Sequence, residues 1–229
     1  EFAFDRSSEV ATRLVDCLKM TNDLVHPNLT PSRVAELLGE ESASKFQDYF
    51  SGITEPSFKE LEKFAVFFGV NEGWLKHGNL PKFNADYFRM SLNPEIATVE
   101  LLNLNDETKE KPTDIYLIRN QSQAGELLII RKYGEWRVDI LRTPMHVSNV
   151  IGAGGYGMLK SFFVTLRILY SLYTSSLFKN AVNVRGYIVK NNKFDDLSEG
   201  IIHPLSLLKS EFNSTWWEDI WDAGMYKKK

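Results

Sequence analysis

The chain has 229 residues, of which 43% are hydrophobic and 13% aromatic, a composition that can build hydrophobic cores and favours a folded protein over a disordered one. The net charge of −3 offers no general attraction to nucleic acid, and the single cysteine, Cys17, excludes an intrachain disulfide or a Cys-x-x-Cys metal site. No apolar run approaches the ~18 residues of a membrane span and no signal peptide is recognisable, so we expect a cytoplasmic protein.

The first third of the chain is typical of successive short helices. Thr30 precedes Pro31, which is a good N-cap followed by proline at the first helical position. Gly39, Gly52 and Gly69 follow runs of helical spacing, and each can adopt the positive φ that ends a helix. Cys17 is expected to be a small buried hydrophobic residue of the first helix. Helices are predicted over residues 8–22, 31–38, 42–51, 57–68 and 70–75.

Beyond a junction near residues 79–84 the pattern changes to runs rich in β-branched residues. Two of the predicted strands form a hairpin that turns at Tyr133-Gly134. Strands are predicted over residues 99–102, 115–119, 126–132, 136–141 and 182–189.

Three helices are predicted in the same part of the chain. The longest, over residues 158–177, is mostly apolar, which indicates a buried or dimer-forming element. Shorter helices are predicted over residues 204–212 and 215–222. We therefore expect a helical domain over residues 1–82, followed by an α+β domain over residues 83–229 that serves dimerisation or sensing.

An ordered set of residues in the helical region resembles the XRE (lambda-repressor/Cro) helix-turn-helix family over about residues 7–80. These residues are Val34-Ala35-Glu36-Leu37-Leu38-Gly39, Gly52, Pro56, Leu61, Ala65, Phe68-Gly69-Val70 and Trp74-Leu75-Lys76-His77-Gly78. Ala35 is small where two helices pack closely, and Gly39 makes the turn between them. The resemblance implies an all-α five-helix lambda-repressor-like N-terminal domain, and hence a sequence-specific DNA-binding transcriptional regulator that acts as a homodimer on double-stranded DNA.

The same resemblance implies which residues contact DNA. In such domains the second helix of the pair enters the major groove with its N-terminal residues on base edges. Gln47 can bond adenine in a bidentate manner, and Lys45 can reach guanine or phosphate. Thr30 and Arg33, at the start of the preceding helix, would face the DNA backbone. The candidate contacts are therefore Thr30, Arg33, Ser42, Ser44, Lys45 and Gln47.

Several residues depart from the family pattern. One extra residue lies after Gly39, and Pro31 stands where the family often has glutamine. Residues 1–82 carry 9 basic and 13 acidic residues, and Glu40 and Glu41 stand where the recognition helix begins. Acidic side chains there repel phosphate. The alternative is a protein-interaction component, of an antitoxin or defence system, that uses the acidic helices as a scaffold.

The segment Gly152-Ala153-Gly154-Gly155-Tyr156-Gly157 matches the pattern GxGxxG and precedes the long predicted helix. Such a loop can present backbone amides to a phosphate. A dinucleotide site also needs an acidic residue ~20 positions later, and residues 158–194 contain none. A flexible hinge is the favoured interpretation.

Other residues of the second domain have weak chemical signals. Asp114 with Glu135-Trp136-Arg137 resembles the Asp…Glu-x-Lys metal site of some nucleases, with arginine in place of lysine, and gives an enzyme acting on nucleotides or nucleic acid as a weaker alternative. Trp216, Trp217 and Trp221 indicate core packing or a partner anchor. The four histidines lack metal-ligand spacing and no nucleophile has a diagnostic setting, so we predict no catalytic residue, cofactor or metal.

Overall fold

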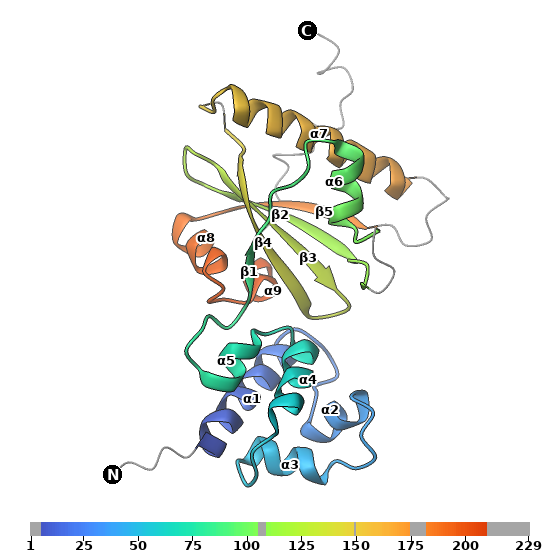
Figure 1. Cartoon of the computed structure of the whole chain (residues 1–229), viewed down its shortest axis with the longest axis vertical. Coiled ribbons are helices and arrows are strands. Elements are labelled where there is room, and N and C mark those ends of the chain that lie inside the picture. Colours follow the sequence, from blue (N-terminus) through green and yellow to red (C-terminus); the bar gives the residue numbers. More distant parts are fainter. Residues whose placement is uncertain (1–5, 105–108, 149, 175–181, 210–229) are drawn as a thin grey trace.

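The computed structural model describes residues 6–104, 109–148, 150–174 and 182–209 (Figure 1). Five helices precede the first strand and gather at one end of the molecule, opposite the sheet (Figure 1). They are α1 (Arg6–Asn22), α2 (Pro31–Leu37), α3 (Ser44–Ser51), α4 (Phe58–Phe68) and α5 (Glu72–His77).

Local chemistry sets the ends of these helices. The Thr30 hydroxyl accepts a hydrogen bond from the backbone N–H of Arg33 at 3.2 Å, which caps α2. Ser57 and Glu60 form a reciprocal capping box at the start of α4. Gly69 ends α4 with φ +67°, a conformation that favours glycine. The side chain of Cys17 is fully buried, as predicted.

The strands of the described residues form one mixed sheet of five, in the order β1-β4-β3-β2-β5. The central strands β2, β3 and β4 are antiparallel, whereas β1 lies parallel to β4 and β5 parallel to β2. The strands are β1 (Ala85–Tyr87), β2 (Asp114–Asn120), β3 (Glu126–Tyr133), β4 (Arg137–His146) and β5 (Asn183–Val189).

Helices cover both faces of this sheet (Figure 1). Successive side chains of a strand point to opposite faces, so Leu127 and Ile129 of β3 pack with α6 (Pro94–Leu101) and α7 (Ala153–Thr174). Leu128 and Ile130 pack on the other face with α8 (Asn191–Ser198) and α9 (Pro204–Leu208). Burial on both faces explains why β2 and β3 read as continuous apolar runs.

The expected fold class, an all-α five-helix lambda-repressor-like domain followed by an α+β domain, is wrong. The described chain is a mixed α/β structure built on one five-stranded sheet. One continuous cluster of buried residues runs from Leu14 and Phe64 of the helices, through Phe83, to Ile118 and Ile130 on the sheet. The core of the helices at the N-terminal end is therefore continuous with that of the sheet.

Other differences from the sequence predictions are local. Residues 99–102, predicted as a strand, belong to the end of α6 and the turn after it, because Asn93 caps that helix and Pro94 opens it. Strand β1 and helix α8 were not predicted. The helix predicted over residues 215–222 lies outside the described residues. Within the part of the chain that the structure describes, none of the helices combines the length and the apolar character that crossing a membrane requires.

Candidate nucleic-acid interface

Helices α2 and α3 form the pair that the sequence analysis singled out (Figure 1). The turn between them passes through Gly39, whose φ of +77° gives it a left-handed backbone. Behind the turn the backbone N–H of Glu40 donates to the carbonyl of Ala35 at 3.0 Å. Val34 and Phe46 are buried in the shared core, so each helix has one apolar face inward and one polar face outward.

The outward face of α3 carries small and amide side chains. Ser44, Gln47 and Ser51 are all exposed, and their spacing places them along one side of the helix. The Gln47 side-chain amide donates to the Ser32 hydroxyl of α2 at 3.3 Å, a bond that links the two helices on their outer surface. Ser42 is also exposed, but it lies in the turn before α3, because this helix begins two residues later than predicted.

Lys45, a predicted DNA contact, forms an ion pair with Glu60 of α4. Partial burial alone would raise the pKa of the Glu60 carboxyl, but hydrogen bonds from Lys45, Ser57 and Tyr49 outweigh burial and lower this pKa to about 2. The Tyr49 hydroxyl donates to Glu60 at 2.8 Å. The ammonium of Lys45 is therefore already neutralised within the protein, although its side chain is 55% exposed.

Thr30 and Arg33, the two residues predicted to contact the DNA backbone, also have partners within the protein. The Thr30 hydroxyl is the N-cap of α2, and Arg33 forms an ion pair with Glu36 at 2.6 Å on the same helix. Both residues are exposed, so the six candidate contacts lie on or beside α2 and α3 at the surface. Residues 30–55 contain two basic and five acidic side chains, which makes this surface acidic.

Sequence reasoning did not identify Glu60 as part of this site. Its signal was present in the capping-box pattern Ser57-x-x-Glu60, which predicts that this carboxylate lies at the N-terminal end of a helix. The approach of Lys45 and Tyr49 from another helix has no local signal, because it depends on how α3 packs against α4 through Phe46 and Phe64, whose ring centroids are 5.0 Å apart.

The chemical motifs predicted in the second half of the chain do not come together in one site among the described residues. The glycine segment is not a loop: from Ala153 onward it forms the first turns of α7, and a Cβ at Gly154 would meet nothing within 4 Å. Asp114 is buried and pairs with Lys132 at 3.6 Å, and no described group of His, Cys, Asp and Glu side chains could hold a metal. The three tryptophans near residue 220 lie outside the described residues.

Comparisons with known proteins add no relative. No protein-family description, curated protein or solved structure matches the chain. The resemblance to the XRE family depends on the residues quoted above and stays a prediction.

Proposed function

We propose that this protein is a sequence-specific DNA-binding transcriptional regulator that reads DNA with α3. The observation that carries the proposal is the exposed polar face of α3, where Ser44, Gln47 and Ser51 stand opposite the buried Phe46 and Phe50. A helix of this size fits the major groove of the duplex, about 12 Å wide. The resemblance of the α2–α3 segment to XRE regulators supports the same use of the helix.

Base recognition is assigned to the uncharged side chains. The Gln47 amide, once it leaves Ser32, can donate and accept hydrogen bonds on the edge of one adenine. The Ser44 hydroxyl, one turn earlier, can bond either a donor or an acceptor of the next base pair. If residues 83–229 form the homodimer, two copies of α3 would contact half-sites about 34–36 Å apart on a palindromic operator.

The paired cations set the strength of this binding. Lys45 and Arg33 must exchange Glu60 and Glu36 for phosphate, so neither adds its full charge to the DNA contact. Because the salt dependence of binding reports how many phosphates are neutralised, we expect a shallow salt slope. The difference in affinity between specific and non-specific DNA should therefore come from base contacts more than from phosphate contacts.

The test is a titration of the full chain against its own upstream DNA and against a scrambled duplex of equal length, at two salt concentrations. We expect the wild-type protein to bind the upstream duplex more tightly than the scrambled one. Gln47→Ala should weaken its binding to the upstream duplex by about 1–3 kcal/mol. Gln121→Ala is the matched control, since Gln121 is an exposed glutamine beyond β2. Equal affinity of wild type and Gln47→Ala for both duplexes would contradict the proposal.

A second candidate, a protein-interaction component of the antitoxin or defence type, is favoured by the acidic surface of residues 30–55. In that case α2 and the turn after it would present Glu36, Glu40 and Glu41 to a basic partner protein. The two candidates predict opposite results for Glu36→Gln and Glu41→Gln. These substitutions strengthen DNA binding in the first case and weaken partner binding in the second.

A further inference from the structure

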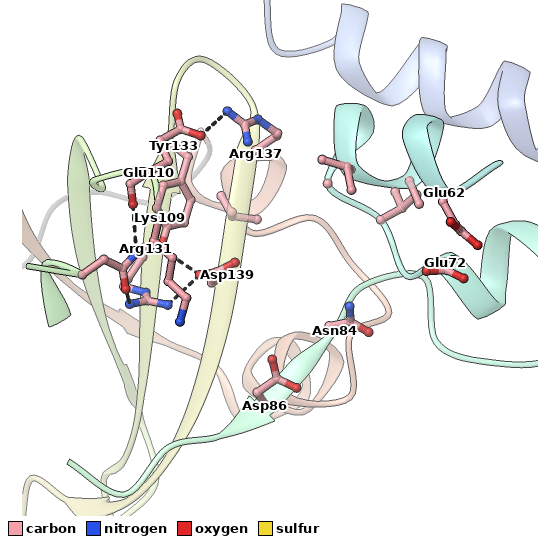
Figure 2. Close-up of a pocket in the computed structure, with 16 residues that line it drawn as sticks. Glu62, Glu72, Asn84, Asp86, Lys109, Glu110, Arg131, Tyr133, Arg137 and Asp139 are labelled. Atoms are coloured by element: carbon pink, nitrogen blue, oxygen red, sulfur yellow. Dashed lines mark hydrogen bonds and ion pairs between the residues drawn. The ribbon is translucent and has the colours of Figure 1, made fainter. Parts of the chain in front are cut away.

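A pocket of about 550 Å³ lies where helices α4 and α5 face the sheet (Figure 2). Its walls come from α4, the start of α5, strand β1, the segment before β2, and the strands β3 and β4. The two sides approach closely beside it: a Cβ at Gly69 would stand 3.3 Å from Cγ of Arg137. The volume is in the range of small-molecule sites, about 300–1,000 Å³.

The side of the pocket formed by α4, α5 and β1 is acidic. Figure 2 shows Glu62, Glu72 and Asp86 on this side, with Asn84 between them. Glu62 and Glu72 share the ammonium of Lys76, which lies 2.9 Å from Glu62. Asp86 is exposed; its backbone pairs with β4, and its carboxylate makes no hydrogen bond or ion pair to a described residue. This side therefore has three carboxylates and one ammonium, which leaves it with a net negative charge.

The opposite side of the pocket, formed by the sheet, carries guanidinium groups (Figure 2). Arg137 donates to Glu110 at 2.5 Å and is 35% exposed, and this is the one hydrogen bond that its five donors make to described residues. Arg131 is held by Asp139 at 2.7 Å and Asn103 at 2.8 Å, while its Nε is buried without a partner among the described residues. The guanidinium of Arg137 is thus oriented by Glu110, and its remaining N–H groups are available to a ligand.

We infer that this pocket binds a free α-amino acid as a zwitterion. Its carboxylate would accept two hydrogen bonds from Arg137, a geometry that guanidinium groups favour. Its ammonium would lie against Asp86 and the Glu62–Glu72 pair. Val66, which is 70% exposed, and the half-buried Val138 supply apolar surface for the ligand side chain. A ligand with both charges contacts both sides of the pocket, whereas an anion or a cation alone contacts only one of them.

The ligand would contact the sheet and α4 at once. Helix α4 also holds α3, through Glu60 and Lys45 and through the ring contact of Phe64 with Phe46. Binding therefore favours one arrangement of α3 relative to the sheet, and by linkage it changes DNA affinity. This last step rests on the proposed function, whereas the binding site itself does not.

The experiment measures binding to the full chain without DNA. Each standard amino acid is screened by thermal shift, and each hit is titrated by calorimetry together with its N-acetyl and its C-terminal amide derivatives. We expect at least one free amino acid to raise the melting temperature. Both blocked derivatives should bind about tenfold more weakly, since each loses a charge-assisted contact.

Variants then assign the two ends of the ligand. Asp86→Asn should weaken free amino acid and C-terminal amide alike, and Arg137→Gln should weaken free amino acid and N-acetyl derivative alike, each by about tenfold. The matched controls are Asp195→Asn and Arg142→Gln, exposed residues outside the pocket, which should bind as wild type does. No shift with any amino acid, or equal binding by the blocked derivatives, overturns the proposal.

The outcome is independent of the DNA experiment. A protein that binds an amino acid but no duplex keeps this site and loses the regulator proposal. A protein that binds its upstream DNA but no amino acid keeps the regulator proposal and loses this site. A protein that binds both is tested for linkage by repeating the DNA titration with the amino acid at saturation, where unchanged affinity contradicts the coupling.

Discussion

Glu60 and Glu62 lie two residues apart on α4 and face different parts of the molecule. Glu60 points to α3, where Ser57, Tyr49 and Lys45 surround its carboxylate and hold the pKa near 2 despite the opposing effect of burial. Glu62 points toward the sheet, is 51% exposed, and lines the pocket beside Lys76. One helix therefore carries a glutamate that three partners hold and a glutamate that is half exposed at a pocket, with Lys76 as its partner.

This difference separates structure from recognition. The hydrogen bonds of Glu60 stabilise the start of α4 and hold α3 against it. The ion pair with Glu60 also offsets the positive charge of Lys45, which weakens the attraction of Lys45 to DNA phosphate. The groups around Glu62 contribute little to stability, because exposed ion pairs are worth about 0–1 kcal/mol each. Substitutions on the α3 side of α4 should change folding first, and those on the sheet side should change ligand binding first.

The largest expected effect is on the α3 side, at Phe64. Its ring is 1% exposed and lies 5.0 Å from the ring of Phe46 and 5.9 Å from that of Phe50. Phe64→Ala should lower the free energy of unfolding by about 3–5 kcal/mol, because it removes buried contacts and leaves a cavity. Urea unfolding followed by circular dichroism measures this loss.

Val66→Ala on the same helix is the control, and it should cost less than about 0.5 kcal/mol, since Val66 is 70% exposed. Hydrogen exchange sharpens the comparison. Because the helices and the sheet share one core, Phe64→Ala should lower protection in β2 and β3 as well as in α3. Loss confined to α1–α5 would mean that the helices fold independently of the sheet.

The next effect is on the sheet side, at His203, which is 4% exposed. Its Nε2–H donates to the carbonyl of Trp136 at 3.0 Å, and its Nδ1 accepts from the backbone N–H of Leu205 at 3.2 Å. The indole of Trp136 in turn donates to the carbonyl of Phe67 at 2.8 Å, which connects α9 to α4. Burial lowers the pKa of His203 from its ordinary value of 6.5 to about 4; the hydrogen bond to Trp136 opposes this shift, and the charge of Lys82 adds a smaller lowering.

A depressed histidine pKa means that the unfolded state binds the proton more readily than the folded state. The contribution of neutral His203 is therefore complete above pH 6.5 and is lost as the pH falls toward 4, by up to about 3 kcal/mol. Urea unfolding at pH 7 and at pH 4.5 measures it. His203→Phe should show a smaller loss between these two values, and an equal loss in both proteins would assign the pH dependence to other groups.

The sequence predicted some of these features well. The residues Thr30 and Pro31 predicted the start of α2, and Tyr133-Gly134 predicted the turn between β3 and β4. Such signals succeed because a cap or a tight turn involves groups within a few residues of one another. The polar side of α3 was also readable, since Phe46 and Phe50 mark the side that must be buried.

What the sequence could not predict depends on distant residues. The shared core follows from contacts such as that of Trp136 with Phe67, whose ring centroids are 5.4 Å apart, and no local pattern announces it. The partner of Lys45 and the two sides of the pocket have the same origin. The prediction for residues 99–102 was wrong for a different reason. A short apolar run fits a strand or a buried helix equally well, and here the N-cap at Asn93 starts a helix that includes it.

A smaller effect on stability should follow from Glu60→Gln, which changes the side of α4 that faces α3. It weakens the capping box and removes the charge that holds Lys45, so unfolding should become easier by about 1–2 kcal/mol. Freed from its partner, Lys45 should neutralise a phosphate, and the salt slope of DNA binding should steepen by about one. Glu55→Gln removes an equal charge without contacting Lys45, so a similar slope in both variants would contradict this role for Lys45.

The smallest effect on folding is expected for Glu36→Gln, which breaks the exposed pair between Arg33 and Glu36 on α2. Pairs of this kind stabilise a helix by about 0.2–0.5 kcal/mol, so the unfolding curve should hardly move. DNA affinity should nevertheless rise, because one repulsive carboxylate leaves the surface and Arg33 becomes available to phosphate. Filter binding at low and high salt measures the gain, which should be larger at low salt. A loss of affinity would instead mean that the acidic face of α2 is itself what a partner recognises.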